Sequence, residues 1–126
     1  MTDFTPIWQF VAFLTAHWIG DFVLQSSWQA SNKHKRLDAL AGHIAIYTVV
    51  LGIAASVLFP FNFVRWALFI GLNGALHFGT DFVTSRVSSS LRAKQDWRPF
   101  FMLIGFDQLV HQVTLAGTMW LIYYRY

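Results

Sequence analysis

Four apolar stretches, each roughly 20 residues long, are the feature that most restricts what this chain can fold into. They cover about residues 6–25, 39–59, 64–85 and 99–124, and short polar segments separate them. About 20 apolar residues in a helix cross the hydrocarbon core of a bilayer, so each stretch could span one. A soluble domain of 126 residues could not bury so many large apolar side chains. We therefore predict an all-α polytopic membrane protein with four transmembrane helices in one bundle, a single domain covering residues 1–126.

The basic residues predict how this bundle is oriented. Seven of the nine Lys and Arg residues fall in two connections, residues 26–38 and 86–98. Basic connections tend to stay on the cytoplasmic side, which places both termini outside the membrane, N-out and C-out. In a soluble protein the formal charge of +3 would suggest nucleic acid, but here it indicates topology and we expect no nucleic-acid partner. The absence of cysteine excludes disulfides, a cysteine nucleophile and thiolate metal ligands.

Two further patterns concern how the helices pair. The segments HWIGDFV and HFGTDFV begin at residues 17 and 77, an offset of 60, and share His, Asp, Phe and Val. This weak repeat suggests two related helical hairpins. In the third stretch Gly71, Ala75 and Gly79 recur every four residues. Such a stripe of small residues predicts the close approach of a neighbouring helix.

Ionisable side chains interrupt all four apolar stretches. We call them the His/Asp cluster: His17, Asp21, His43, His77, Asp81, Asp107 and His111. Six of them form pairs four residues apart, a spacing that puts both side chains on one helix face. At about 1.5 Å of rise per residue, all seven fall in the half of the membrane nearer the basic connections. Because an aspartate in the middle of a membrane helix costs about 2.5–3.5 kcal/mol, these residues need compensation inside the bundle.

A divalent metal ion would provide that compensation. Imidazole nitrogen and carboxylate oxygen together bind Zn, Mn, Fe or Ni, and helical bundles build such sites from facing helices. We predict these metal ligands: His17, Asp21, His77, Asp81, Asp107 and His111. A metal-bound water could attack an ester or phosphate bond in a lipid-linked or phosphorylated substrate that arrives from the cytoplasmic leaflet. Asp21, Asp81 and His43 are the candidate catalytic residues, with His43 as a ligand or proton carrier.

The same residues fit two other classes of protein. Each imidazole could hydrogen-bond the carboxylate one turn away and only hold helices together, as in a non-catalytic subunit of a larger membrane assembly or phage envelope. Besides the bilayer, a membrane-protein partner or a homo-oligomer would then be expected. Alternatively, buried His and Asp could form a proton or ion pathway. The outer half of the stretches offers few polar residues, so we rank the pathway third.

Basic and hydroxyl side chains outside the apolar stretches allow weaker predictions. Arg86, Arg92, Lys94 and Arg98 act first as topology determinants, with phosphate binding at the mouth of the site as a second interpretation. His34 lies in the basic segment NKHKR and is expected to face anionic lipid headgroups. Residues 88–90, all serine, are expected to form flexible loop.

The ordered motifs HWIGDFVLQ, HIAIY, HFGTDFVTSR and FDQLVH resemble bacterial and phage inner-membrane proteins grouped as domain-of-unknown-function family 3307. The resemblance runs from about residue 10 to residue 120. Besides the His/Asp cluster it includes Gln25 and Gln108. It implies the bacterial inner membrane and no settled activity. The chain is also more distantly similar to membrane-bound metal-dependent hydrolases, which carry His-x-x-x-Asp motifs. That similarity covers the pairs 17/21 and 77/81, whereas 107/111 has the reverse order.

Overall fold

The computed structural model describes residues 3–125, and every regular element among them is helical. The elements are α1 (Thr5–Trp18), α2 (Ser27–Asn32), α3 (Leu37–Leu58), α4 (Phe63–Ala93) and α5 (Trp97–Met119). Two π-helical turns follow, Ile19–Val23 after α1 and Trp120–Tyr124 after α5. The predicted all-α fold is confirmed for these residues. One described helix, α3, is long and apolar enough by composition to cross a membrane.

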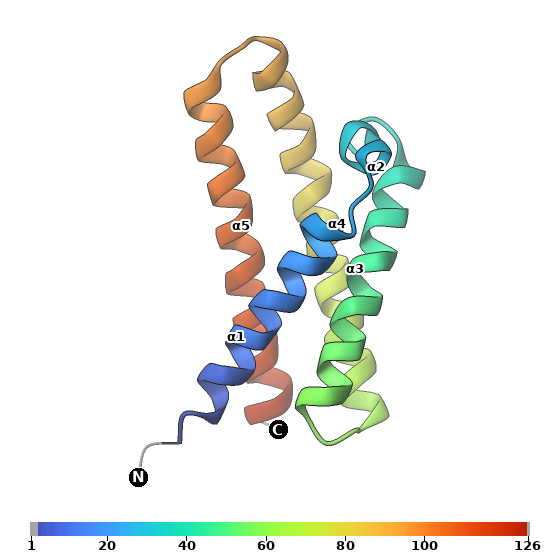
Figure 1. Cartoon of the computed structure of the whole chain (residues 1–126), viewed down its shortest axis with the longest axis vertical. Helices are drawn as coiled ribbons and strands as arrows, with labels where there is room; N and C mark the ends of the chain where they lie inside the picture. The colour runs from blue at the N-terminus through green and yellow to red at the C-terminus, as the bar shows by residue number, and fades with distance from the viewer. Residues whose placement is uncertain (1–2, 126) are drawn as a thin grey trace.

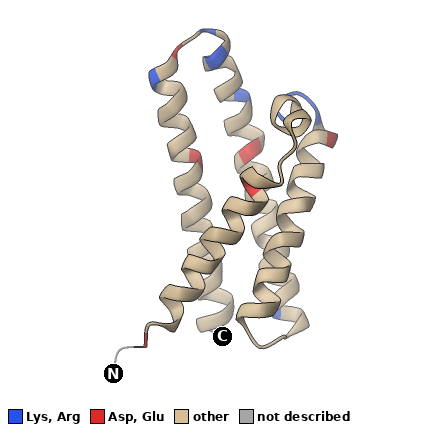
Figure 2. Cartoon of the chain, viewed as in Figure 1, with Lys and Arg blue, Asp and Glu red and all other residues tan. Residues whose placement is uncertain are grey.

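Helices α3, α4 and α5 run along the longest axis of the molecule, and α1 crosses at a slant (Figure 1). Helix α3 packs against α1 and α4, and α4 packs against α5. Both termini lie at one end of the bundle, while α2 and the connection between α4 and α5 lie at the other. Lys and Arg gather mainly at the end with α2, as Figure 2 shows. The polar and basic connections therefore share one end, which we call the basic end.

The apolar core fills the half of the bundle near the termini. It consists of Phe13, Tyr47, Leu51, Ala55, Phe69, Leu115, Met119 and Ile122. Tyr47 marks the upper edge of this core, because its ring lies 4.1 Å from the His77 ring and 5.6 Å from the His17 ring. Beyond Tyr47, towards the basic end, the interior becomes polar. The apolar core therefore lies between the His/Asp cluster and the end of the bundle that holds the termini.

Helix α4 is longer than the sequence predicted. The third stretch was expected to end at about residue 85 and Ser88–Ser90 to form a loop, and both predictions are wrong. Polar side chains in this part of the helix bond to its own carbonyls: Ser88 donates to Ser85 O, and Arg86 to Phe82 O. The connection to α5 is accordingly short, and Gln95 turns the chain there with a positive φ of 56°.

The stripe of small residues does not pack against another helix of this chain. A Cβ built on Gly71 or Gly79 would meet no atom within 4 Å, so the predicted close approach is wrong for this face. The close approach occurs instead at Gly74, where a Cβ would lie 3.1 Å from Thr48 Oγ1 of α3. Gly74 lies on the buried side of α4, and the stripe lies on the exposed side.

Candidate metal centre

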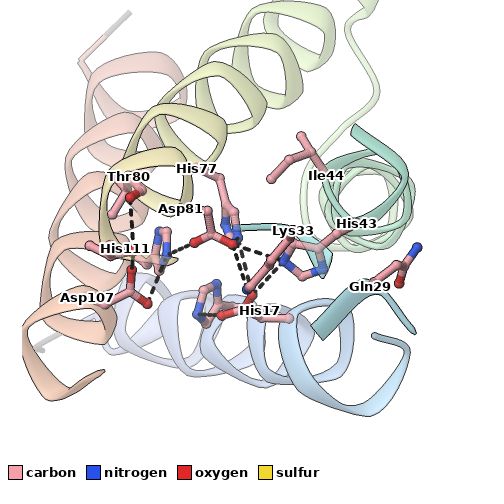
Figure 3. A network of polar contacts seen from close by, with 12 residues as sticks. His17, Gln29, Lys33, His43, Ile44, His77, Thr80, Asp81, Asp107 and His111 are labelled. Atoms are coloured by element: carbon pink, nitrogen blue, oxygen red, sulfur yellow. Dashed lines mark hydrogen bonds and ion pairs between the residues drawn. The ribbon is translucent and has the colours of Figure 1, made fainter. Parts of the chain in front are cut away.

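The His/Asp cluster comes together at one level of the bundle (Figure 3). Helix α1 supplies His17, α3 supplies His43, α4 supplies His77 and Asp81, and α5 supplies Asp107 and His111. Asp21 comes from the π-helical turn after α1, a type of irregularity that is frequent at functional sites. Six of the side chains are buried to within 4% exposure, and Asp107 is 13% exposed. The structure thus brings all the predicted residues into one buried group.

The shortest contacts in the cluster run between helices. Nε2 of His43 lies 3.0 Å from Asp21 Oδ1, and Nε2 of His111 lies 3.0 Å from Asp81 Oδ1. His77 Nε2 lies 3.2 Å from Asp21 Oδ1.

The three pairs spaced four residues apart are more open. Their nitrogen–oxygen distances are 3.4 Å in 17/21, 3.5 Å in 77/81 and 3.4 Å in 107/111. The carboxylates are therefore shared across helices, and the pairs are not separately neutralised couples.

Ligand atoms from the cluster form two groups of the size of a metal site. Asp21, His43, His77 and Asp81 each offer an atom within 4.8 Å of the others, and Asp81 also joins Asp107 and His111 in a second group. Two donors bound at about 2.0–2.1 Å to a tetrahedral metal lie about 3.3 Å apart. The distance from His43 Nε2 to Asp81 Oδ2 is also 3.3 Å. The first group offers two nitrogen and two oxygen donors, a set suited to Zn, Mn, Fe or Ni.

His77 is the residue of the first group whose hydrogen-bonding atoms are least satisfied. Both of its ring nitrogens are buried without a hydrogen bond to any described residue. Nε2 nevertheless faces two carboxylates, at 3.2 Å and 3.5 Å, without hydrogen-bond geometry. A buried polar atom without a partner is costly, and a cation between the imidazole and the carboxylates would provide one.

Lys33 supplies a positive charge that the sequence did not predict at this place. Its Nζ lies 2.9 Å from Asp81 Oδ2, although Lys33 follows α2 and Asp81 is on α4. Three aspartates and one lysine leave a formal charge of −2 on the cluster when the histidines are neutral. One divalent cation would balance that charge. Local sequence gives no signal for Lys33, because its position depends on how α2 folds against α3.

Hydrogen bonds around the cluster hold its carboxylates. Thr84 donates to Asp107 Oδ1 at 2.6 Å, and Gln108 Nε2 donates to Asp107 Oδ2 at 3.1 Å and Asp21 Oδ2 at 3.3 Å. Such outer contacts orient the ligands of metal sites. The buried Nδ1 atoms of His17, His43 and His77 are a departure from this pattern, because they have no partner among the described residues.

The two groups of ligand atoms treat His17 and His43 differently from the ligand set predicted from the sequence. His17 belongs to neither group of ligand atoms, and its Nε2 lies 3.2 Å from Gln108 Oε1. His43, predicted from the sequence as a ligand or proton carrier, is fully buried and belongs to the first group. The geometry therefore places His43 among the candidate ligands and His17 beside them.

A cavity of about 340 Å³ opens from the cluster towards the basic end. Asp21, Asp81 and Asp107 line one part of it, and the rest is formed by side chains from α2 and its flanking segments, α4 and α5. Small molecules can therefore reach the carboxylates, since pockets that bind them have about this volume.

These observations define an all-helical protein with a buried, ligand-accessible His/Asp cluster. The chain belongs to a family of proteins of unknown function, DUF3307, whose model matches residues 9–124. The match includes the whole His/Asp cluster and confirms the family resemblance seen in the sequence. Neither the comparison with curated proteins nor the comparison with solved structures gives a match. The similarity to metal-dependent hydrolases remains a prediction.

Proposed function

We propose that this protein binds a divalent metal ion in the cytoplasmic half of a four-span bundle and hydrolyses a lipid-linked or phosphorylated substrate there. The observation that carries the proposal is the convergence of imidazole and carboxylate atoms from separate helices on Asp21 and Asp81. Asp21, His43, His77 and Asp81 would hold the ion. Asp107 and His111 complete a second group around Asp81.

The bound ion would make a water molecule acidic enough to act as a nucleophile near neutral pH. Asp107 is suited to accept the proton from that water, because it lines the cavity and is more exposed than the other carboxylates of the cluster. His43 is fully buried and has less access to solvent. We therefore move the proton-transfer role, assigned to His43 from the sequence, to Asp107.

Exposed apolar side chains support the membrane location. On α3, Ile53 is 62% exposed and Val57 is 79% exposed, and the outer face of α5 presents Phe101, Phe106 and Val113. Soluble monomers rarely expose continuous apolar faces of this kind. The four long helices and the grouping of charge at the basic end agree with N-out and C-out topology in a bacterial inner membrane.

A second candidate function is structural. The hydrogen-bonded contacts His43–Asp21 and His111–Asp81 join α3 to the π-helical turn after α1, and α5 to α4. They would also suit a non-catalytic subunit of a larger membrane assembly, in which the cluster only fixes the helices.

Metal analysis of the protein purified in detergent without chelators tests the first function against the second. We expect a divalent ion in near-stoichiometric amount, retained on gel filtration and lost in Asp81→Asn. Asp38→Asn is the matched control, because Asp38 is an exposed carboxylate paired with Arg36 away from the cluster. A wild-type protein that takes up no divalent ion, or an Asp81→Asn variant that retains it, would refute metal binding.

A further inference from the structure

Part of the wall of the cavity beside the His/Asp cluster is polar because of side chains other than the three aspartates. Because α4 continues as a helix to Ala93, Ser85, Ser88 and Arg92 follow at intervals of three and four residues and lie on one face. All three line the cavity, as does Lys33 after α2. Hydroxyl, guanidinium and ammonium groups thus line the cavity beside the proposed metal ligands.

Ser85 is the group in this wall that most clearly lacks a partner. Its residue is 8% exposed, and its Oγ is buried without a hydrogen bond to any described residue. Gln25 Oε1, which also belongs to a cavity-lining residue, is buried without a partner. Buried polar groups are normally satisfied, so two residues with such groups in the lining of one cavity indicate a polar ligand.

The basic residues of the α4–α5 region differ in whether they line the cavity. Arg92 lines it, whereas Arg86 donates to Phe82 O and lies 3.6 Å from the centre of the Phe82 ring. On the α5 side the wall becomes apolar, with Leu103 and Ile104. An anionic group would therefore lie between α2 and α4, and an attached organic group would lie along α5.

Charge determines when an anion could enter. Three aspartates line the cavity with Lys33 and Arg92, so without a metal and with the histidines neutral its formal charge is −1, which disfavours anions. A divalent ion changes this charge to +1. That ion would also compete with Lys33 for Asp81 Oδ2, leaving the ammonium free to contact an anion instead.

We propose that this cavity is a phosphate-binding site, in which Ser85, Lys33 and Arg92 hold the phosphate group of a phosphomonoester next to the metal ion. This inference rests on the proposed function and names its substrate class. It requires the metal to bind before the phosphate. The phosphomonoester could be a soluble metabolite or a lipid headgroup, because both present the same group.

Calorimetric titration of the detergent-purified, metal-loaded protein with inorganic phosphate tests the proposal. We expect binding that weakens at least about tenfold after the metal is removed with a chelator, and about tenfold in Arg92→Gln or Ser85→Ala. Arg86→Gln, on the same helix but outside the cavity, should bind phosphate within about twofold of wild type. Each variant must first be shown to retain its metal.

The outcomes separate the two proposals. A protein that binds metal but no phosphate, or binds phosphate equally well in Arg92→Gln and Ser85→Ala, overturns the phosphate site and leaves the metal centre intact. A protein that takes up no metal overturns both. To identify the source of the phosphate, the titration is repeated in phosphatidylcholine nanodiscs with and without phosphatidic acid. Competition by phosphatidic acid assigns the site to a lipid headgroup, and its absence assigns the site to a soluble phosphomonoester.

Discussion

Replacing Lys33 with methionine should tighten metal binding. The Lys33 ammonium lies 2.9 Å from Asp81 Oδ2, where it neutralises the same carboxylate that a metal ion would use. A cation entering the first ligand group must therefore break this ion pair. Methionine keeps most of the length of the side chain and removes the charge. The empty site then carries one more uncompensated negative charge.

The magnitude follows from the geometry. At 2.9 Å and an effective dielectric constant of about 20, the Coulomb energy of the pair is about 6 kcal/mol. Desolvation offsets much of it, and hydrogen bonds to charged groups contribute a net of about 1.5–3 kcal/mol. Since 1.4 kcal/mol is a factor of ten, we expect Lys33→Met to bind the metal about ten- to a hundredfold more tightly. Without metal, the same variant should unfold at a lower temperature, because Asp81 has lost its cation.

Two measurements on the detergent-purified protein check this prediction: competition with a chelating fluorophore for the metal Kd, and thermal unfolding with and without metal. Lys35→Met is the control, since it removes a neighbouring positive charge that does not line the cavity. Equal metal affinity in Lys33→Met, Lys35→Met and wild type would show that the ammonium and the metal do not compete. The reasoning would then be refuted, whatever the change in stability.

Three other predictions follow from particular contacts. His77→Leu should abolish metal uptake while His17→Gln retains it, because only His77 belongs to a ligand group; metal analysis of the two variants decides. Gly74→Leu should destabilise the protein by about 1–3 kcal/mol because its side chain meets Thr48 of α3, whereas Gly71→Leu faces open space and should be neutral; denaturant unfolding in detergent compares them. Because the chain has no cysteine, Phe61→Cys and Lys35→Cys can each be labelled alone with an impermeant maleimide; only Phe61→Cys should react in intact spheroplasts, and the reverse would contradict the topology.

The sequence predicted the parts of the fold that depend on local pattern. Apolar length located the four long helices, and the spacing of four residues placed His77 with Asp81 and His111 with Asp107 on shared faces. The end of α4 was missed, because serine and arginine were interpreted as loop although hydroxyl and guanidinium groups bond to the carbonyls of their own helix. Polarity there marks a change of environment and not the end of the helix.

The contacts between helices could not be predicted from local pattern. The position of Asp21 relative to His17 depends on the π-helical turn Ile19–Val23, because a π-helical turn is wider than an α-helical one. The spacing of the two residues did not indicate that turn. Lys33 reaches Asp81 only because α2, fixed by the capping box of Ser26 and Gln29, folds back over the bundle. Both features follow from tertiary packing, which a single sequence does not display.

His77 is the residue that best separates a metal centre from a cluster that merely joins helices. A joining role requires hydrogen bonds, and His43 and His111 make them to carboxylates on other helices. His77 makes none among the described residues, although its imidazole is buried and its Nε2 lies 3.2 Å from Asp21 Oδ1. As a joining residue it has only the ion-pair contacts of Nε2 with Asp21 and Asp81, at 3.2 Å and 3.5 Å, to offset the cost of burying its imidazole. As a ligand, its Nε2 would bind a cation that both carboxylates also contact. The burial of His77 beside two carboxylates therefore favours the metal centre.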